Sequence, residues 1–322
     1  MTDQPASHSV AQDLLSHLHV IDVSTPIARD CARFLASLGA RVTRLEREAL
    51  SADPDSLRDQ VAKADILVES FMPGDMAAMG LGYEALSQVN PGLIQVSITP
   101  FGQSGPYARY KGGELVAAAL AGTLYQMGEK DGSPVREPGD ANFFHACGAG
   151  AAGAMLAEFA RRKTGRGQLV DIAAQEMGAG RATVALVKHM LGDTVPGRNG
   201  QAIDMGNGPS RVLWPLKDAL AFYMEGKPGT PPAEQMDDWI EEETGKRPAP
   251  SHDMDTVAAF LASMTEEEAI AKTRARKIRL MSVSSPQDVA EDVQLAARGF
   301  FTQGESGKQP GYFIKAIARD EA

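Results

Sequence analysis

Short β-branched segments alternate with amphipathic segments through the first hundred residues, and this alternation constrains the fold more than any other feature. Parallel strands need a long crossover connection between them, and a helix is the usual one. The alternation therefore predicts an α/β domain with a parallel sheet and helices on its faces. The strands are expected at residues 19–23, 41–45, 64–69 and 93–98, and the first helix at residues 28–38, before Gly39.

The chain is expected to contain two domains joined by a linker. Gly, Pro and Asn are frequent between residues 193 and 215, as is typical of a connection between domains. We therefore expect a large domain at 1–192, a linker at 193–215, a small domain at 216–300 and a short final segment at 301–322. Later helices are expected at 115–124, 141–162, 178–191, 234–243 and 255–264, strands at 169–172, 219–224 and 312–314, and a capping box at Thr265 and Glu268.

Charge and composition exclude several classes of function. The chain has 42 acidic and 32 basic residues, a net charge of −10, which argues against nucleic acid or an anionic membrane as a partner. The first residues do not resemble a signal peptide, and the longest uncharged run, 141–157, is too short to span a membrane. Cys31 and Cys147 belong to no metal-binding motif. These observations predict a cytoplasmic protein without a metal site.

Asp140 directly precedes the expected helix at 141–162, and two roles fit this position. An aspartate here commonly caps the helix by accepting a backbone hydrogen bond, and local sequence alone favours that role. A helix N-terminus also keeps a carboxylate anionic, and an anionic carboxylate can attack a thioester or an anhydride. Asp140 is therefore also a candidate nucleophile.

The loop at residues 101–107, FGQSGPY, follows the fourth strand directly. Ligands bind at the carboxyl ends of strands in open parallel sheets, so this loop is a candidate ligand contact. Gln103 and the backbone N–H groups around Gly102 and Gly105 are suited to binding a carbonyl or carboxylate oxygen. The chain has no glycine-rich nucleotide-binding signature and no nucleophile elbow, so neither of those functions is expected.

Five stretches resemble, in order, the family III CoA-transferases, which include formyl-CoA transferase, the carnitine CoA-transferases and α-methylacyl-CoA racemase. The most recognisable stretch begins ADILVESFMPGDMAAMG and continues to residue 107. The five stretches cover most of the chain between Ile21 and Phe301. They lie at residues 20–46, 64–107, 139–172, 212–224 and 282–301.

The resemblance implies a Rossmann-like large domain, a smaller α+β domain and an intertwined dimer. It implies that Asp140 is the catalytic aspartate, which passes through an acyl-aspartyl anhydride and an aspartyl-CoA thioester, with Gln103 also in the catalytic site. Coenzyme A is implied as a substrate, together with a small carboxylic acid. The acyl-CoA contacts that follow from the resemblance are Ser70, Phe71, Gly74, Gly102 and Gly105.

The chain also departs from the family pattern. The segment after Glu46 is shorter than in typical members and lacks a basic strand that helps to hold CoA. Ala78 stands where some members have an arginine for a CoA phosphate, and Ile27 where formyl-CoA transferase has a glutamine. Gly113 stands where the racemases have a histidine, so proton abstraction from a substrate lacks one acid–base group. Only a short segment follows Phe301, where typical members return to the large domain.

Three hypotheses about function remain from the sequence. The first is an enzyme that moves CoA between an acyl-CoA and a carboxylic acid. The second is a catalytically reduced subunit that assembles with a complete family member, which the loss of basic CoA contacts favours. The third is other acyl-CoA chemistry, such as racemisation or isomerisation, on the same scaffold. The resemblance and the long irregular middle segment predict a dimer, either a homodimer or a heterodimer with a longer paralogue.

Overall fold

The chain folds into two compact units. Unit 1 comprises Met1–Tyr125, Val135–Val195 and Gly299–Ala322, and unit 2 comprises Gln126–Pro134 and Pro196–Arg298. The segment Gln126–Pro134 thus belongs to unit 2, although it lies within residues 1–192. The computed structural model describes residues 14–192, 195, 197, 198, 200, 202–204, 209–224, 229–304 and 307–311.

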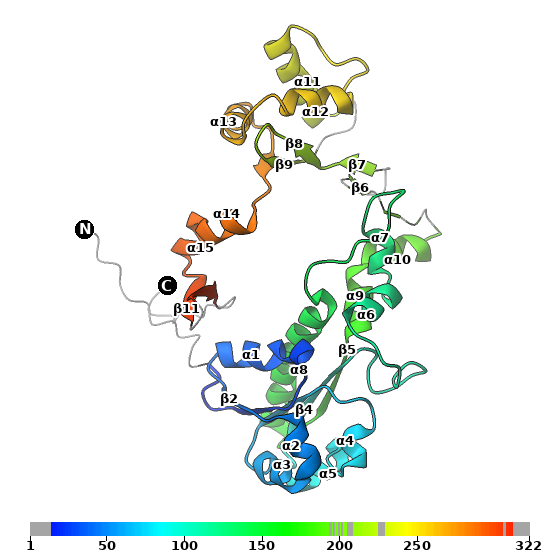
Figure 1. The fold of residues 1–322 in the computed structure, drawn as a ribbon, viewed down its shortest axis with the longest axis vertical. Helices are drawn as coiled ribbons and strands as arrows, with labels where there is room; N and C mark the ends of the chain where they lie inside the picture. Colours follow the sequence, from blue (N-terminus) through cyan, green and yellow to red (C-terminus); the bar gives the residue numbers. More distant parts are fainter. Residues whose placement is uncertain are drawn as a thin grey trace, which may run out of the picture. The chain divides into compact units, whose positions relative to one another are not determined.

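A parallel sheet forms the centre of unit 1, as the alternation of strands and helices predicted (Figure 1). In the described part of the chain it has five strands in the order β2-β1-β3-β4-β5, and every neighbouring pair is parallel. The chain therefore winds outwards in both directions from β1 and β3. The strands are β1 (His19–Asp22), β2 (Arg41–Arg44), β3 (Ile66–Glu69), β4 (Ile94–Thr99) and β5 (Leu169–Ala173).

Helices cover both faces of this sheet (Figure 1). On one face, α1 (Asp30–Ser37) and α8 (Ala141–Thr164) pack against side chains such as Val20 and Val96. On the other face, the chain packs against Ile21 and Leu67. Because successive side chains of a strand point to opposite faces, the buried strands β1 and β3 supply both cores, whereas β4 supplies apolar side chains to the first core only. The helices of the second face are α2 (Arg47–Ala52), α3 (Pro54–Val61), α4 (Asp75–Ala78) and α5 (Tyr83–Val89), and the short 3-10 helix η2 (Pro26–Ala28) precedes α1.

Two helices expected as single elements are each split into two. The expected helix at 115–124 is α6 (Glu114–Leu120) followed by α7 (Thr123–Gln126), with Gly122 at φ +84° between them. The expected helix at 178–191 begins earlier and consists of α9 (Ala174–Arg181) and α10 (Thr183–Met190). A residue with positive φ cannot continue a right-handed helix, which accounts for the first break.

Helix α8 lies unusually close to the sheet because glycines face the strands. A Cβ atom added at Gly153 would lie 2.7 Å from Cγ1 of Val170, and one at Gly150 would lie 3.1 Å from Cγ1 of Val96. Both distances are shorter than ordinary van der Waals contact, so these positions need glycine for the helix to approach the strands. The small residues of α8 therefore serve helix–sheet packing within unit 1.

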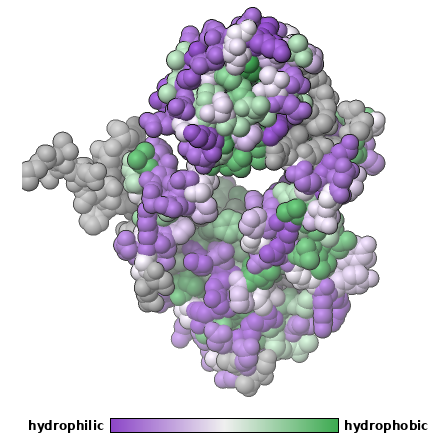
Figure 2. Space-filling view, turned by 45° about the horizontal axis from the view of Figure 1, so that its top comes forward, coloured by the Kyte–Doolittle hydropathy of each residue, from purple (hydrophilic) through white to green (hydrophobic). Residues whose placement is uncertain are grey.

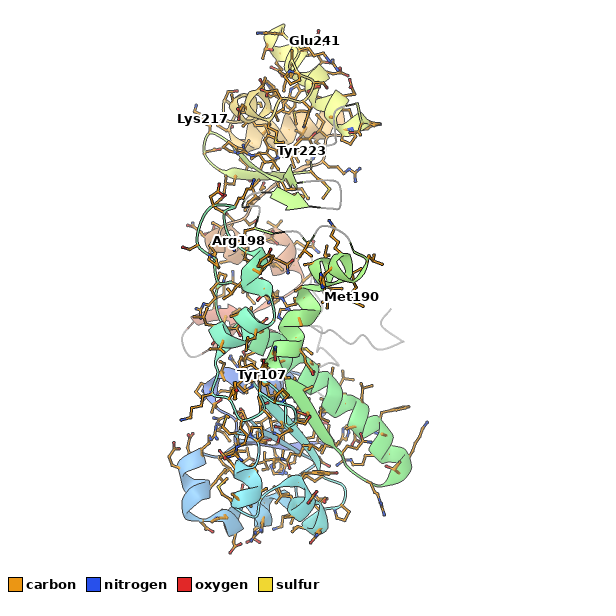
Figure 3. The ribbon with its side chains drawn as sticks, turned by 90° about the vertical axis from the view of Figure 1, so that its right-hand side faces the viewer. Tyr107, Met190, Arg198, Lys217, Tyr223 and Glu241 are labelled. Carbon is orange, nitrogen blue, oxygen red and sulfur yellow. The ribbon has the colours of Figure 1, made fainter. Side chains whose placement is uncertain are left out.

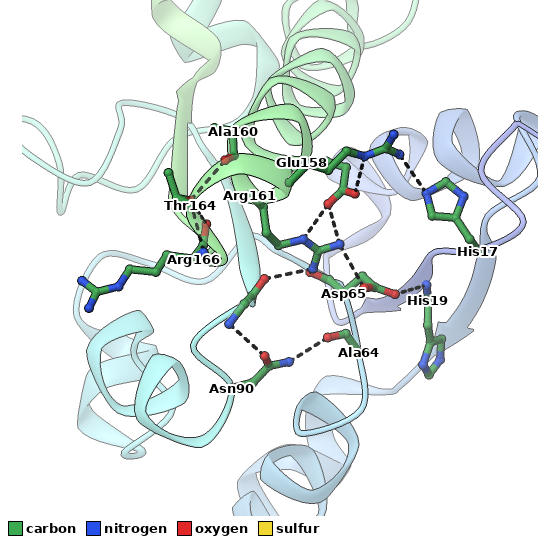
Figure 4. Close-up of polar contacts among 12 residues, drawn as sticks. His17, His19, Ala64, Asp65, Asn90, Glu158, Ala160, Arg161, Thr164 and Arg166 are labelled. Atoms are coloured by element: carbon green, nitrogen blue, oxygen red, sulfur yellow. Dashed lines mark hydrogen bonds and ion pairs between the residues drawn. The ribbon is translucent and has the colours of Figure 1, made fainter.

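The C-terminal end of α8 is fixed by a network of ion pairs (Figure 4). Arg161 contacts the Asp65 carboxylate at 3.0 Å and the Glu158 carboxylate at 2.5 Å, and it donates to the Gly92 carbonyl at 3.0 Å. Asn90 joins the same region by donating to the carbonyls of Val61 and Ala64. The network holds α8 against the loops that precede β3 and β4.

Unit 2 contains a small antiparallel sheet and three longer helices. The sheet has the order β10-β9-β8, and its inner face packs through Trp214 and Tyr223 against Trp239 of α11. The predicted capping box is confirmed, because Thr265 and Glu268 exchange both hydrogen bonds at the start of α13. The elements are β8 (Leu213–Pro215), β9 (Leu220–Tyr223), β10 (Leu280–Ser282), α11 (Pro231–Thr244), α12 (Met254–Leu261) and α13 (Glu266–Arg276).

The remaining elements precede β8 or follow β10 in the sequence. The segment at 193–215 is not wholly irregular, since it holds the hairpin β6 (Ala202–Asp204) and β7 (Pro209–Arg211) before β8. After β10 follow α14 (Pro286–Glu291), α15 (Val293–Ala297) and the hairpin β11 (Phe301–Gly304) and β12 (Gly307–Pro310). The strand expected at 312–314 lies outside the described residues. Figure 2 shows that the face of unit 2 turned to the viewer is mainly hydrophilic.

A search of the described residues finds no helix with the length and apolarity that a membrane crossing requires.

Candidate functional site

Asp140 occupies the N-cap position of α8, but its side chain does not cap the helix. Within the described part of the chain, the carboxylate makes no capping hydrogen bond, and the residue is exposed. Gly139, at φ +71°, sets the turn that leads the chain into the helix. The position of Asp140 is thus as the sequence predicted, whereas the local capping role is not present.

Glu114 supplies the cap in its place. This glutamate is the first residue of α6, and its side chain is buried. Its carboxylate accepts hydrogen bonds from the backbone N–H of Asn142 at 3.0 and 3.1 Å and from that of Phe143 at 3.1 Å. These are the N–H groups that an N-cap side chain normally satisfies. Asp140 is therefore left at a helix N-terminus with its carboxylate uncommitted.

Side chains around this helix end fix its position. Arg181 of α9 donates to Oδ1 of Asn142 at 3.2 Å and pairs with the Glu137 carboxylate. One turn after Asp140, the ring of Phe144 packs edge-on against that of Phe34 in α1, with 5.3 Å between centroids. The start of α8 is thus anchored to α6, α9 and α1.

Three of the residues expected to contact acyl-CoA, Ser70, Phe71 and Gly74, lie at the carboxyl edge of the sheet, after β3. The Ser70 hydroxyl accepts the backbone N–H of Thr25 at 2.8 Å. The guanidinium of Arg47 lies 3.6 Å from the centroid of the Phe71 ring, and its Nη1 donates to the Ser70 carbonyl at 3.4 Å. Burial lowers the pKa of Arg47, although the neighbouring Glu69 carboxylate opposes this. The predicted residues Ser70 and Phe71 therefore lie beside a cation that the sequence reasoning missed.

The loop after β4 uses its backbone N–H groups internally. The N–H of Gly102 donates to Oγ1 of Thr99 at 2.8 Å, and that of Gln103 donates to the Asp171 carboxylate at 3.0 and 3.1 Å. The expected use of these two N–H groups to bind a ligand oxygen is therefore not available in this conformation. Gly105, at φ +94°, is exposed in the same loop.

Tyr107 closes the loop on itself. Its ring packs edge-on against that of Phe101, with 6.1 Å between the centroids, and it is labelled in Figure 3. The tilted ring of Tyr110 lies 5.2 Å from it on the other side. The aromatic contacts thus belong to the loop itself.

Three of the predicted residues line one cavity of about 450 Å³: Phe71, Gly74 and Gln103. The cavity also contains Glu69 and Gln95, which sequence reasoning missed. Burial raises the pKa of the Glu69 carboxyl, although hydrogen bonds from Ser97, the Phe71 backbone and Gln95 oppose this. Asp140 is not among the residues that line this cavity.

Two of the missed residues had different kinds of signal. Glu69 is the last residue of β3 and lies in the stretch at 64–107 that resembles the family, so that resemblance was a signal for it. Glu114 caps a helix 28 residues further along the chain, and no local pattern connects the two positions.

Two short helices, α2 and α3, form the segment that follows β2. Arg47 begins the first of them and lines a second cavity of about 440 Å³ together with Phe71 and Ala78. Glu48 and Asp75 line the same cavity. Arg44, at the end of β2, pairs with the buried Asp22 carboxylate at 2.5 Å.

The family model for CoA-transferase family III matches residues 51–319. The chain belongs to this family. The match spans the loop after β3, Asp140 with its helix, and all of unit 2, but it begins after Arg47.

Characterised relatives resemble parts of the chain. The succinyl-CoA:(R)-benzylsuccinate CoA-transferase subunit BbsE of Thauera aromatica is 42% identical over 132 residues, which cover 41% of this chain and 32% of that protein. The human succinyl-CoA:glutarate CoA-transferase is 40% identical over 116 residues, which cover 36% of this chain and 26% of that protein. These matches thus span about a third or less of the length of the relatives.

The fold matches solved structures over almost its full length. A CAIB/BAIF family protein from Brucella suis superposes with a TM-score of 0.79 at 20% identity, covering 94% of this chain and 92% of that one. The structure of Rv3272 from Mycobacterium tuberculosis gives a TM-score of 0.74 at 18% identity. At these identities the likeness is evidence for the fold alone.

Proposed function

We propose that the chain transfers CoA from an acyl-CoA to a carboxylic acid, with Asp140 as the nucleophile. The observation that carries the proposal is the uncommitted carboxylate at the start of α8. Glu114 satisfies the N–H groups of Asn142 and Phe143, so Asp140 is free to react. The carboxylate lies at the N-terminus of a 24-residue helix, where it can act as a nucleophile.

The transfer then proceeds through two covalent states of Asp140. A carboxylate oxygen attacks the thioester carbonyl, the C–S bond breaks, and CoA leaves as a thiolate with an acyl-aspartyl anhydride behind it. The thiolate attacks the Asp140 carbonyl of the anhydride, which releases the first acid as a carboxylate and leaves an aspartyl-CoA thioester. The acceptor carboxylate repeats these steps in reverse, so atoms and charge balance without a further reactant.

We place an uncharged part of CoA against the loop after β3. The ring of Phe71 and the guanidinium of Arg47 line the second cavity, and the small side chain of Ala78 leaves space there. Glu48 and Asp75 line the same cavity, so it disfavours phosphates and suits the pantetheine arm. Replacing Phe71 by Ala should raise KM for the acyl-CoA more than it lowers kcat, as steady-state kinetics would show.

The central test is a search for the covalent intermediate. The full chain is incubated with succinyl-CoA, the donor named in both relatives described above, and the digest is analysed by mass spectrometry with and without hydroxylamine. A CoA adduct, or its hydroxamate after trapping, is expected on the peptide that contains Asp140. An adduct on a different peptide, or none with any acyl-CoA that the chain turns over, would falsify the assignment.

A second candidate function is that of one subunit in a pair. Large apolar side chains stay exposed on the helices of unit 1, among them Leu156 at 72%, Met190 at 75% and Leu191 at 77% (Met190 is labelled in Figure 3). Such residues mark surfaces that pack against another chain. Succinyl-CoA–L-malate CoA-transferase of Chloroflexus aurantiacus is named as an alpha and a beta subunit.

The proposed assembly is a homodimer or a pair with a longer paralogue. Sedimentation at micromolar concentration should give twice the mass of the 34.2 kDa chain if it is a homodimer. A monomer that exchanges CoA only after a longer family member is added would support the pair. A fully active monomer would contradict both assemblies.

A further inference from the structure

The cavity of about 450 Å³ in unit 1 has a polar floor and apolar walls. It lies where α4 and the start of α5 meet β4 and β5, and its walls include Phe71, Met76 and Leu169. Its floor includes Glu69 and Gln95, which are 1% and 3% exposed. Buried polar side chains beside open space are uncommon unless they bind something.

The hydrogen bonds of the floor have a fixed direction. Nε2 of Gln103 donates to Oγ of Ser97 at 2.6 Å, so the Ser97 hydroxyl accepts there and its own proton is free to point elsewhere. The Ser97 side chain hydrogen-bonds to the Glu69 carboxyl, which also accepts the backbone N–H of Phe71 at 2.6 Å. The donors of the floor are therefore used inside the network.

Gln95 is the point where this network is incomplete. Its side chain hydrogen-bonds to Glu69, and a carboxylate accepts only from the amide nitrogen. Its Oε1 is buried and has no hydrogen-bond partner among the described residues. A buried acceptor without a donor destabilises the protein. A ligand in the cavity that donates a hydrogen bond to this oxygen would therefore bind more tightly.

We propose that this cavity binds a small molecule that presents an N–H group to Oε1 of Gln95 and packs an apolar body against Phe71, Met76 and Leu169. The described lining contains two charged side chains, Glu69 and Glu84, and both are acidic. The site therefore accepts neutral amides and ammonium ions and rejects carboxylates and phosphates. The inference does not depend on the proposed CoA transfer, since its readout is binding.

Three probes with the same carbon chain separate these possibilities. Butyramide, n-butylammonium and butyrate are each titrated into the full-length chain, and binding is followed by saturation-transfer NMR. Butyramide, butylammonium or both should bind, and whichever binds identifies the neutral or the cationic class. Butyrate should bind at least about tenfold more weakly. Equal binding of all three, binding of butyrate alone, or binding of none overturns the proposal.

Variants then locate the site. Gln95→Met removes the unpaired acceptor at similar volume and should lower probe affinity at least about fivefold. Ala77→Phe fills the cavity from an exposed position of α4 without touching the floor, and it should abolish binding. Gln88→Met, on the exposed face of α5 and outside the cavity, is the matched control and should bind as the native chain does.

Circular dichroism and thermal melting establish that each variant is folded. If Gln95→Met does not fold, Ala77→Phe decides the question alone. Undiminished binding in the folded Ala77→Phe variant overturns the proposal.

Discussion

At its C-terminal end, α8 is held by side chains that are fully engaged, whereas at its N-terminal end the Asp140 carboxylate is not. The guanidinium of Arg161 donates to two carboxylates, of Asp65 and Glu158, and to the Gly92 carbonyl. At the other end, the buried Glu114 satisfies the backbone of the helix. The charged side chains at the C-terminal end of α8 therefore stabilise the fold, whereas the Asp140 carboxylate at the N-terminal end remains available for reaction.

This difference separates a structural aspartate from a reactive one. Asp65 and Asp140 both stand next to a helix or strand end, and local sequence gives both a structural explanation. Only the partners distinguish them, since Asp65 has Arg161 at 3.0 Å and Asp140 has no capping bond within the described residues. The predictions below test this comparison, from the largest expected effect to the smallest.

Replacing Asp140 by Asn should abolish CoA exchange while leaving the fold intact. Loss of a covalent nucleophile typically lowers kcat by about 10⁴-fold or more. Because the Asp140 side chain makes no capping bond in the described structure, the free energy of unfolding should change by less than about 0.5 kcal/mol. Kinetics and urea denaturation measure the two effects. Exchange within tenfold of the native rate would remove the proposed mechanism.

Replacing Glu114 by Ala should affect both stability and activity. The buried N–H groups of Asn142 and Phe143 lose a charged acceptor, which should cost about 3 kcal/mol of unfolding free energy. Asp140 is then the nearest acceptor for the helix end, so CoA exchange per folded molecule should also fall. Glu176→Ala, an exposed change in the first turn of α9, is the control and should shift stability by about 0.5 kcal/mol or less. Native-like exchange in Glu114→Ala would show that Asp140 does not need this cap.

Replacing Arg161 by Met should affect stability alone. The Glu158 and Asp65 carboxylates, whose side chains are 10% and 30% exposed, lose their shared cation, and about 2–3 kcal/mol of unfolding free energy should be lost. Arg162→Met is the matched control, because that side chain is 63% exposed and should contribute less than about 1 kcal/mol. Exchange per folded molecule should match the native rate in both variants. A loss of CoA exchange in Arg161→Met but not in Arg162→Met would contradict a purely structural role for the C-terminal end of α8.

Cys147 lies between the two ends of α8, and its thiol should have a smaller, pH-dependent effect on the free energy of unfolding. Burial, followed by lesser contributions from its neighbours, raises the pKa of this thiol to about 12. The folded state therefore resists ionisation that the unfolded state undergoes from about pH 9 upwards, and stability is lost as pH rises through that window. Between pH 9 and pH 10 the native chain should lose about 1 kcal/mol more than Cys147→Ala in urea denaturation. Parallel losses in the two proteins would contradict the buried thiol.

The sequence predicted the parallel sheet of unit 1 and the position of Asp140, because both depend on local patterns. Alternating β-branched runs such as that around Ile66 identified the strands, and Asp140 directly precedes a long helix. The partner of that helix end could not be predicted, since Glu114 and Asn142 meet only through the tertiary fold. The same holds for Arg47, whose guanidinium stacks on the ring of Phe71, a residue 24 positions further along the chain. Local patterns identify elements, whereas the state of a charged side chain depends on contacts distant in sequence.

The pairing of β4 with β5 bears on how the chain folds as it is synthesised. Gln95 pairs with Leu169, so the sheet edge at β4 stays open while the ribosome makes all of α6, α7 and α8. An edge strand that is buried in the finished fold but still unpaired is a template for wrong association. The nascent chain therefore passes through a stage, between about residues 100 and 170, at which a chaperone that shields β4 would raise the yield of folded protein.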